Sequence, residues 1–132
     1  MTAPRTRIMI VDADAEHGAN LARALRERNY EVATTRSCDE VLHSAAEGKF
    51  DLVLTDHSQP GIDGIELTRK VKSTGRDVKV VFFSDALDLD MYIKEMNCGA
   101  EDCLEKPCRP EEVLRIIETS LRKKVDAQGG TQ

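Results

Sequence analysis

Four polar residues stand at or just beyond the ends of short apolar runs: Asp12, Asp56, Ser84 and Lys106. Two carboxylates, a hydroxyl and an ammonium group together could carry out phosphoryl transfer. Asp56 can act as the nucleophile, Lys106 can pair with it at rest and with a phosphoryl oxygen afterwards, and Ser84 can donate a hydrogen bond to that same group. A phosphoryl group adds a charge of about −2, so its arrival would be a strong local switch.

The two carboxylates predict a divalent cation beside them. Carboxylates about 5 Å apart repel each other by roughly 3 kcal/mol at an effective dielectric of about 20. Magnesium suits such a place, because it binds one or two carboxylates and keeps several waters. It would also neutralise the oxygens of an incoming phosphoryl group. The sequence therefore predicts Mg²⁺ as the cofactor.

The apolar runs have the features of strands that are buried on both faces of a parallel sheet. They are short, continuous and rich in β-branched residues: Ile8–Val11, Leu52–Thr55 and Val78–Phe83. Glu31–Thr35 is less apolar and suits an edge strand, and the short segment Asp102–Leu104 lies between two helical stretches. The sequence therefore predicts five strands.

Helical patterns fill the gaps between these strands. Ser37–Glu40 is a capping box that opens one helix, Gly64–Ser73 and Leu87–Met96 follow later strands, and Pro110 stands at the start of a last helix that reaches Lys124. The alternation predicts an α/β fold, a doubly wound (βα)5 flavodoxin-like three-layer sandwich with a parallel five-stranded sheet in the order 2-1-3-4-5. Such sheets bind ligands beyond the carboxyl ends of their strands, where the four polar residues would converge.

The composition and charge of the chain indicate which kinds of partner and which cellular location to expect. The chain has 132 residues, 40% of them apolar and 33% charged, and a net charge of −5. These values fit one globular domain and disfavour direct binding of nucleic acid or an anionic membrane. No apolar run has the length of a membrane span and the N-terminus lacks a signal-peptide pattern, so a cytoplasmic location is predicted. We expect a domain over residues 1–124 and a polar tail or the start of a linker over 125–132.

The cysteines contain no Cys-x-x-Cys pair: Cys38, Cys98, Cys103 and Cys108. A zinc site usually needs closer pairs. In a chain with no Trp, these thiols are expected to act as small core hydrophobes instead.

Two segments resemble the motifs of response-regulator receiver domains. Phe50–Asp56 with Pro60–Leu67 is similar to the phosphoacceptor segment of that family, and Gly99–Pro107 is similar to the segment that carries its lysine. The resemblance covers roughly residues 6 to 122, nearly one whole domain. It implies a CheY-like signalling domain of two-component systems, not an enzyme beyond self-catalysed phosphotransfer and autodephosphorylation.

The resemblance also implies a role for individual residues. A sensor histidine kinase or a phosphotransfer protein would phosphorylate Asp56. The acidic pocket that holds Mg²⁺ would consist of Asp12, Asp56 and the backbone carbonyl of Ser58, and Ser84 and Lys106 would stabilise the phosphoryl group. The face formed by the fourth helix, the fifth strand and the fifth helix would carry the output, often through homodimerisation.

The sequence departs from the family pattern in the acidic pocket. Receivers usually carry two adjacent acids after the first strand, but here the second position is Ala13. The hypothesis is that Asp14 or a water fills the gap and that magnesium binds weakly.

The switch region departs as well. Cys103 stands where the family has its switch aromatic, so coupling of Ser84 to an aromatic flip would be absent or would take another route. Ser58 and Ala86 occupy positions that tune dephosphorylation in the family. His57 follows the acceptor directly, and since neighbours on a strand point apart, a structural or surface role is expected for it.

Three other functions are compatible with parts of the pattern. Ala13 and Cys103 suggest a pseudo-receiver, a protein-interaction module that signals without phosphorylation. Asp12 and Asp14 also resemble the first motif of haloacid-dehalogenase-like phosphatases, but no acidic pair follows Lys106. An FMN-binding flavodoxin is disfavoured, because the acids of the first loop would repel the FMN phosphate.

Overall fold

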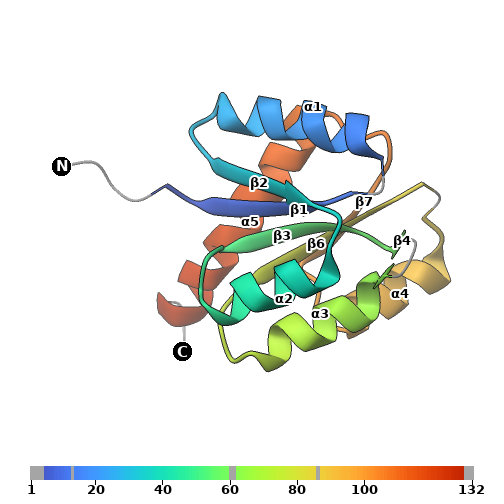
Figure 1. The fold of residues 1–132 in the computed structure, drawn as a ribbon. Coiled ribbons are helices and arrows are strands. Elements are labelled where there is room, and N and C mark those ends of the chain that lie inside the picture. Colours follow the sequence, from blue (N-terminus) through green and yellow to red (C-terminus); the bar gives the residue numbers. More distant parts are fainter. Residues whose placement is uncertain (1–4, 13, 60–61, 86, 130–132) are drawn as a thin grey trace.

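The sheet contains five parallel strands in the order β2-β1-β3-β6-β7, as the ribbon shows (Figure 1). Its strands are β1 (Arg7–Val11), β2 (Glu31–Thr35), β3 (Leu52–Asp56), β6 (Lys79–Ser84) and β7 (Asp102–Glu105). A computed structural model of the chain describes residues 5–12, 14–59, 62–85 and 87–129. Numbered within this sheet alone, the order is 2-1-3-4-5, which confirms the predicted flavodoxin-like fold.

Burial along the strands follows from their place in the sheet. Every residue of the central strand β3 is buried, whereas the edge strand β2 contains only exposed and half-buried residues. A central parallel strand is covered by helices on both faces and must be apolar throughout. The sequence therefore predicts both positions correctly. The apolar run Leu52–Leu54 lies in a central strand, and the mixed run Glu31–Thr35 lies in an edge strand.

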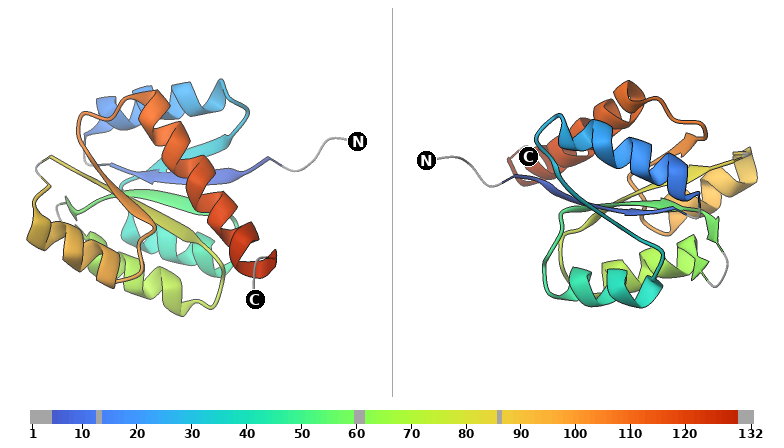
Figure 2. Two further views of the ribbon diagram at one scale, coloured as in Figure 1. Left: turned by 180° about the vertical axis from the view of Figure 1, so that it is seen from behind. Right: turned by 45° about the horizontal axis from the view of Figure 1, so that its top comes forward.

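Five helices cover the two faces of the sheet (Figure 2). They are α1 (Ala15–Arg26), α2 (Cys38–Ala46), α3 (Gly64–Ser73), α4 (Leu89–Asn97) and α5 (Pro110–Gly129). Buried side chains of α1 and α5 share one core cluster with Ile8 and Ile10 of β1, and those of α2 and α3 share another with Met9 and Val11. Alternate residues of one strand thus enter opposite cores, as the pleat requires.

Helix ends follow the capping chemistry of the sequence. The side chain of Ser37 accepts a hydrogen bond from the backbone N–H of Glu40, as the predicted capping box requires. Asp14, Asp63 and Asp88 cap α1, α3 and α4 in the same way. Helix α4 therefore begins at Leu89, two residues after the predicted start, because Asp88 is its cap.

Two further differences from the sequence-based expectations concern local structure. A small antiparallel ladder of β4 (Ser58–Gln59) and β5 (Ile62–Asp63) follows β3 and was not predicted. The last helix continues to Gly129, beyond its predicted end at Lys124. The division into a domain over 1–124 and a tail stays a prediction. Ala13 and Ala86 lie outside the described residues.

The cysteines lie at the margins of the two cores. All are half-buried free thiols. Cys38, Cys98 and Cys103 pack against the core on the α2–α3 side, and Cys108 packs against the core on the α1–α5 side. Searching the described part of the chain for a helix with the length and apolarity of a membrane span gives none.

Candidate functional site

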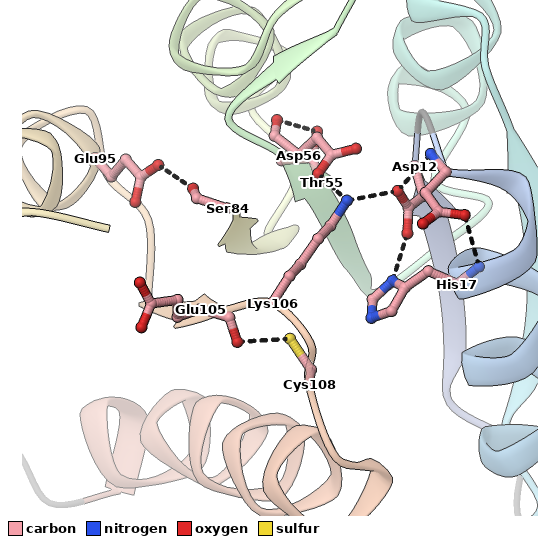
Figure 3. A network of polar contacts seen from close by, with 10 residues as sticks. Asp12, His17, Thr55, Asp56, Ser84, Glu95, Glu105, Lys106 and Cys108 are labelled. Atoms are coloured by element: carbon pink, nitrogen blue, oxygen red, sulfur yellow. Dashed lines mark hydrogen bonds and ion pairs between the residues drawn. The ribbon is translucent and has the colours of Figure 1, made fainter. Parts of the chain in front are cut away.

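The register of the sheet brings the four predicted residues to one edge. Val11 pairs with Thr55, so the next residues, Asp12 and Asp56, are neighbours across β1 and β3. In the same way Asp56 pairs with Phe83, just before Ser84, and Ser84 pairs with Glu105, just before Lys106. Asp12, Asp56 and Ser84 are each 5% exposed. The convergence predicted from the strand ends is therefore correct in geometry (Figure 3).

Lys106 bridges the two carboxylates (Figure 3). Its Nζ lies 2.8 Å from Oδ1 of Asp12 and 2.6 Å from Oδ1 of Asp56. The ammonium also lies 5.0 Å from the centre of the Phe83 ring, a cation–π distance. Burial lowers the pKa of Lys106, but the bonds to both carboxylates outweigh burial and raise it above its usual value. The lysine therefore stays charged and offsets the repulsion between the acids.

A second basic side chain, His17 on α1, holds the other oxygen of Asp12. His17 Nδ1 lies 2.6 Å from Asp12 Oδ2, and the backbone N–H of Asp14 donates to Asp12 Oδ1 at 2.9 Å. Burial raises the pKa of Asp12, but the bonds from Lys106, His17 and Asp14 outweigh it and keep the pKa below its usual value. Asp12 is thus an ionised carboxylate with partners on both oxygens.

Asp14, the proposed substitute for the missing acid, serves as the N-cap of α1. Its Oδ1 accepts a hydrogen bond from the backbone N–H of His17 at 3.1 Å. Its backbone N–H also donates to Asp12. The residue therefore has a structural role at the helix start, and a role in metal binding stays a prediction.

Ser84 makes its hydrogen bond to helix α4. Its Oγ donates to Oε2 of Glu95 at 3.4 Å (Figure 3). The same oxygen lies 2.7 Å from Nδ1 of His57, the residue after Asp56. His57 therefore has a buried acid as its partner, and the expected structural or surface role stays a prediction.

Cys103, at the predicted switch position, is a half-buried residue of β7. Its Sγ lies 3.9 Å from Sδ of Met96 on α4. Burial in the first place, and then the neighbouring Glu95 carboxylate, raise the pKa of the Cys103 thiol well above its usual range. The side chain is therefore a neutral thiol that packs against α4.

Gly64 allows α3 to begin directly beside Asp56. A Cβ at this position would lie 2.5 Å from the backbone oxygen of Asp56 and 2.7 Å from a ring carbon of Phe82. Its backbone N–H donates to the carbonyl of His57 at 2.9 Å. Only glycine fits this close approach of helix and strand. The approach therefore explains why glycine follows Asp63 at the start of α3.

The oxygen groups present fit a magnesium ion only in part. Two carboxylates, Asp12 and Asp56, and the backbone carbonyl of Ser58 have suitable chemistry. Within residues 5–12, 14–59, 62–85 and 87–129, however, there is no cluster of three or more His, Cys, Asp or Glu that could hold a metal. Ala13 offers no carboxylate. The set fits an ion held largely through water.

Two residues of the site were not found from the sequence, His17 and Glu95. Glu95 carries a signal, since it shares the less exposed face of α4 with Met91 and Cys98, which stand four residues before it and three after it. An acid within such a stripe indicates a buried polar contact. His17 carries no comparable signal, because its contact with Asp12 depends on where α1 begins.

The fold is a doubly wound parallel sheet with a lysine between two acids at its carboxyl edge. Comparison with known proteins agrees, since the model of the response regulator receiver domain family matches residues 8–118. The chain belongs to this family. Receiver domains are signalling domains of two-component systems.

Relatives with established names support the assignment. The transcriptional regulatory protein PrrA of Mycobacterium tuberculosis is 32% identical over 124 residues, which are 94% of this chain and 52% of PrrA. The response regulator MprA of a Mycobacterium species is 30% identical, over 93% of this chain and 54% of MprA. The chain therefore spans about half the length of these relatives.

Solved structures share the fold. A CheY-like receiver domain from Methanospirillum hungatei aligns with a TM-score of 0.86 at 26% identity, over 94% of this chain and 99% of that one. The BeF3-activated receiver domain of DrrB aligns with a TM-score of 0.80 at 25% identity, over 90% of this chain and 99% of that one.

Proposed function

We propose that this receiver domain is phosphorylated on Asp56 by a partner histidine kinase or phosphotransfer protein, and that the modification switches an output surface. The observation that carries the proposal is the bridge from Lys106 to Asp56 and Asp12 across the ends of β1 and β3. A buried carboxylate at this edge needs a cation, and a mobile ammonium can move from the carboxylate to a phosphoryl oxygen.

The transfer would proceed by in-line displacement. An oxygen of Asp56 forms a bond to phosphorus while the bond between phosphorus and the ring nitrogen of the donor histidine breaks. The leaving nitrogen keeps the electron pair and takes up a proton. Lys106 stabilises the phosphoryl oxygens by its positive charge, and the Ser84 hydroxyl donates a hydrogen bond to one of them. These two donors reduce the repulsion between the negatively charged phosphoryl group and the carboxylate of Asp12.

Magnesium would supply further positive charge at the phosphoryl oxygens. Asp12, Asp56 and the carbonyl of Ser58 would hold it. We expect weak binding, because Ala13 offers no carboxylate and Asp12 already has partners on both oxygens.

The test is intact mass after incubation with acetyl phosphate, with and without Mg²⁺. The wild-type chain should gain the mass of one phosphoryl group, faster with Mg²⁺. Asp56→Asn should gain none. Asp51→Asn is the matched control, because Asp51 precedes the same strand at its other end and pairs with Arg7; it should behave as wild type.

A pseudo-receiver is the second candidate. It is favoured by Ala13 and by the pair of His17 with Asp12, which together leave the acidic pocket poorly suited to a metal. Absence of any phosphoryl gain by wild type with acetyl phosphate and Mg²⁺ would establish it. A haloacid-dehalogenase-like phosphatase would instead release phosphate after loss of Asp56 and fail after loss of Asp12. The capping role of Asp14 weighs against such an acid/base pair.

The output surface is proposed to be the face of α4, β7 and α5. Three apolar side chains of α4 are exposed there: Leu89 by 71%, Tyr92 by 40% and Ile93 by 45%. Exposed apolar patches of this kind often serve association, so a homodimer through this face is proposed. We further propose that the chain acts in the cytoplasm and that this segment does not itself bind nucleic acid.

A further inference from the structure

Helix α4 buries an acid and exposes its apolar residues. Glu95 is the helix's buried residue, with its side chain 0% exposed. Its Oε1 has no hydrogen-bond partner in the part of the chain that the structure describes. Burying a carboxylate is costly, and fold stability alone would favour an apolar side chain at this position. The arrangement therefore calls for a functional reason.

The contacts of Glu95 lead to both strand ends beside the acceptor. Its Oε2 lies 2.7 Å from Nδ1 of His57 and accepts a hydrogen bond from Oγ of Ser84 at 3.4 Å. His57 directly follows Asp56, and Ser84 ends the neighbouring strand β6. A single carboxylate oxygen thus connects α4 to β3 and β6 at the phosphoryl site.

Position 103, the family's switch position, has no aromatic side chain in this protein. The residue there is a thiol, which has no ring that could turn in and out of the core. Burial in the first place, and then the Glu95 carboxylate, raise the pKa of the Cys103 thiol. The hydroxyl of Ser84 therefore has Glu95, and not an aromatic ring, as its connection to α4.

We propose that Glu95 is the positioning residue through which α4 senses phosphorylation: at rest its carboxylate holds the Ser84 hydroxyl, and a phosphoryl group on Asp56 takes that hydroxyl over. The inference rests on the proposed phosphorylation of Asp56. It gives the chain a polar switch of two side chains, Ser84 and Glu95, in place of an aromatic one.

The geometry favours an exchange of this kind. At 3.4 Å the bond from Ser84 to Glu95 is long, whereas hydroxyl hydrogen bonds to charged oxygens are typically about 2.5–2.7 Å. A phosphoryl oxygen would offer Ser84 the shorter bond. The phosphoryl charge would also repel the Glu95 carboxylate. Both effects act in the same direction, because each weakens the attachment of α4 to β6.

Movement of α4 would alter the exposed apolar face of the same helix. Leu89, Tyr92 and Ile93 of α4 have exposed side chains, whereas Glu95 of the same helix is buried. Release of Glu95 from Ser84 would therefore change how this face is presented. In this way the loss of one hydrogen bond at the sheet edge would affect the proposed output surface.

The test is NMR of the backbone amides of α4, with and without acetyl phosphate and Mg²⁺, at occupancies matched by intact mass. The variants are Glu95→Met, Ser84→Ala and the double variant. Glu101→Gln is the control, because that carboxylate bonds to Lys72 and to the Val80 N–H, not to the site. Glu95→Gln retains the side-chain shape if Glu95→Met does not fold.

In wild type, phosphorylation should shift the α4 amides. In Glu95→Met the amides should already lie toward the phosphorylated positions, and the further shift should be much smaller. Glu95→Gln should show a partial loss of the shift. Adding Glu95→Met to Ser84→Ala should change the shift much less than Glu95→Met does alone, because the two side chains share one hydrogen bond. The control should retain the full shift.

Two different results would overturn the inference. A wild-type-sized shift in Glu95→Met at equal phosphoryl occupancy would show that α4 senses the site by another route. An equal loss in Glu101→Gln would make the effect unspecific. Failure of the proposed function looks different, since wild type itself would then gain no phosphoryl group.

Discussion

Lys106 Nζ lies 2.6 Å from Oδ1 of Asp56, so the residue that follows β7 neutralises the residue that ends β3. The two side chains come from strands separated by β6 in the sheet. The same ammonium reaches Asp12 at 2.8 Å. The charge balance at this edge of the sheet therefore depends on Lys106.

Lys106→Met should lower the free energy of unfolding by roughly 3 kcal/mol in the absence of Mg²⁺, because it leaves buried carboxylates without their cation. Added Mg²⁺ should restore part of the loss, since it binds only the folded pocket. Urea unfolding with and without Mg²⁺ measures both effects. Lys70→Met is the control, because Lys70 forms an exposed pair with Glu66 that should contribute at most about 1 kcal/mol. Equal losses in the two variants would contradict the prediction.

Ala13→Asp should raise the affinity for Mg²⁺ by about tenfold, or about 1.4 kcal/mol, because it restores a carboxylate ligand. Titration calorimetry of wild type and variant measures the affinity. Ala19→Asp adds the same charge on an exposed position of α1 and should leave the affinity near that of wild type. If wild type already binds as tightly as Ala13→Asp, the acid at position 13 is not the missing ligand.

Gly64→Ala should destabilise the fold by about 2 kcal/mol or more through overpacking, because its Cβ would lie 2.5 Å from the backbone oxygen of Asp56. It should also slow phosphoryl uptake by displacing the acceptor strand. Gly75→Ala is the control: no heavy atom lies within 4 Å of its Cβ, and its φ is +79°, so it should cost only about 1 kcal/mol from backbone strain. Chemical unfolding compares the two, and a similar cost for both would argue against a steric requirement at Gly64.

Alkaline pH should destabilise the protein through Cys108. Burial in the first place, and then Glu112, raise the pKa of this thiol from 9.0 to about 11. The folded state thus disfavours the thiolate, so this contribution to stability is complete below pH 9.0 and is lost as the pH rises toward about 11. Unfolding measured across this range should show a shallower decline in Cys108→Ala than in wild type. Identical declines would contradict the predicted shift.

Ile93→Glu should prevent dimer formation by the phosphorylated chain, because it places a charge in the exposed apolar face of α4. Sedimentation velocity after acetyl phosphate treatment measures the association, and intact mass confirms equal phosphoryl occupancy. Arg23→Glu, on the exposed side of α1, is the control and should still associate. A dimer of Ile93→Glu as stable as that of wild type would place the contact elsewhere.

The sequence alone predicted the five strands of the main sheet, their order and the residues at their ends, but not the small β4–β5 ladder. Runs such as Leu52–Leu54 are too apolar for any place but the centre of a parallel sheet, and Glu31–Thr35 is too polar for one. Because parallel strands present their carboxyl ends at one edge, the sequence is sufficient to place Asp12, Asp56, Ser84 and Lys106 together. Local periodicity and chain direction are sufficient for such conclusions.

Only the tertiary structure decided which partners these residues have. Ser84 bonds to Glu95, Asp12 bonds to His17, and Lys106 bridges two acids. Helix α4 shows the reason most clearly. Its large apolar residues Leu89, Tyr92 and Ile93 are exposed, whereas the acid Glu95 is buried. The rotation of a helix about its axis depends on the side chains of the strands beneath it, and those contacts join residues far apart in the sequence.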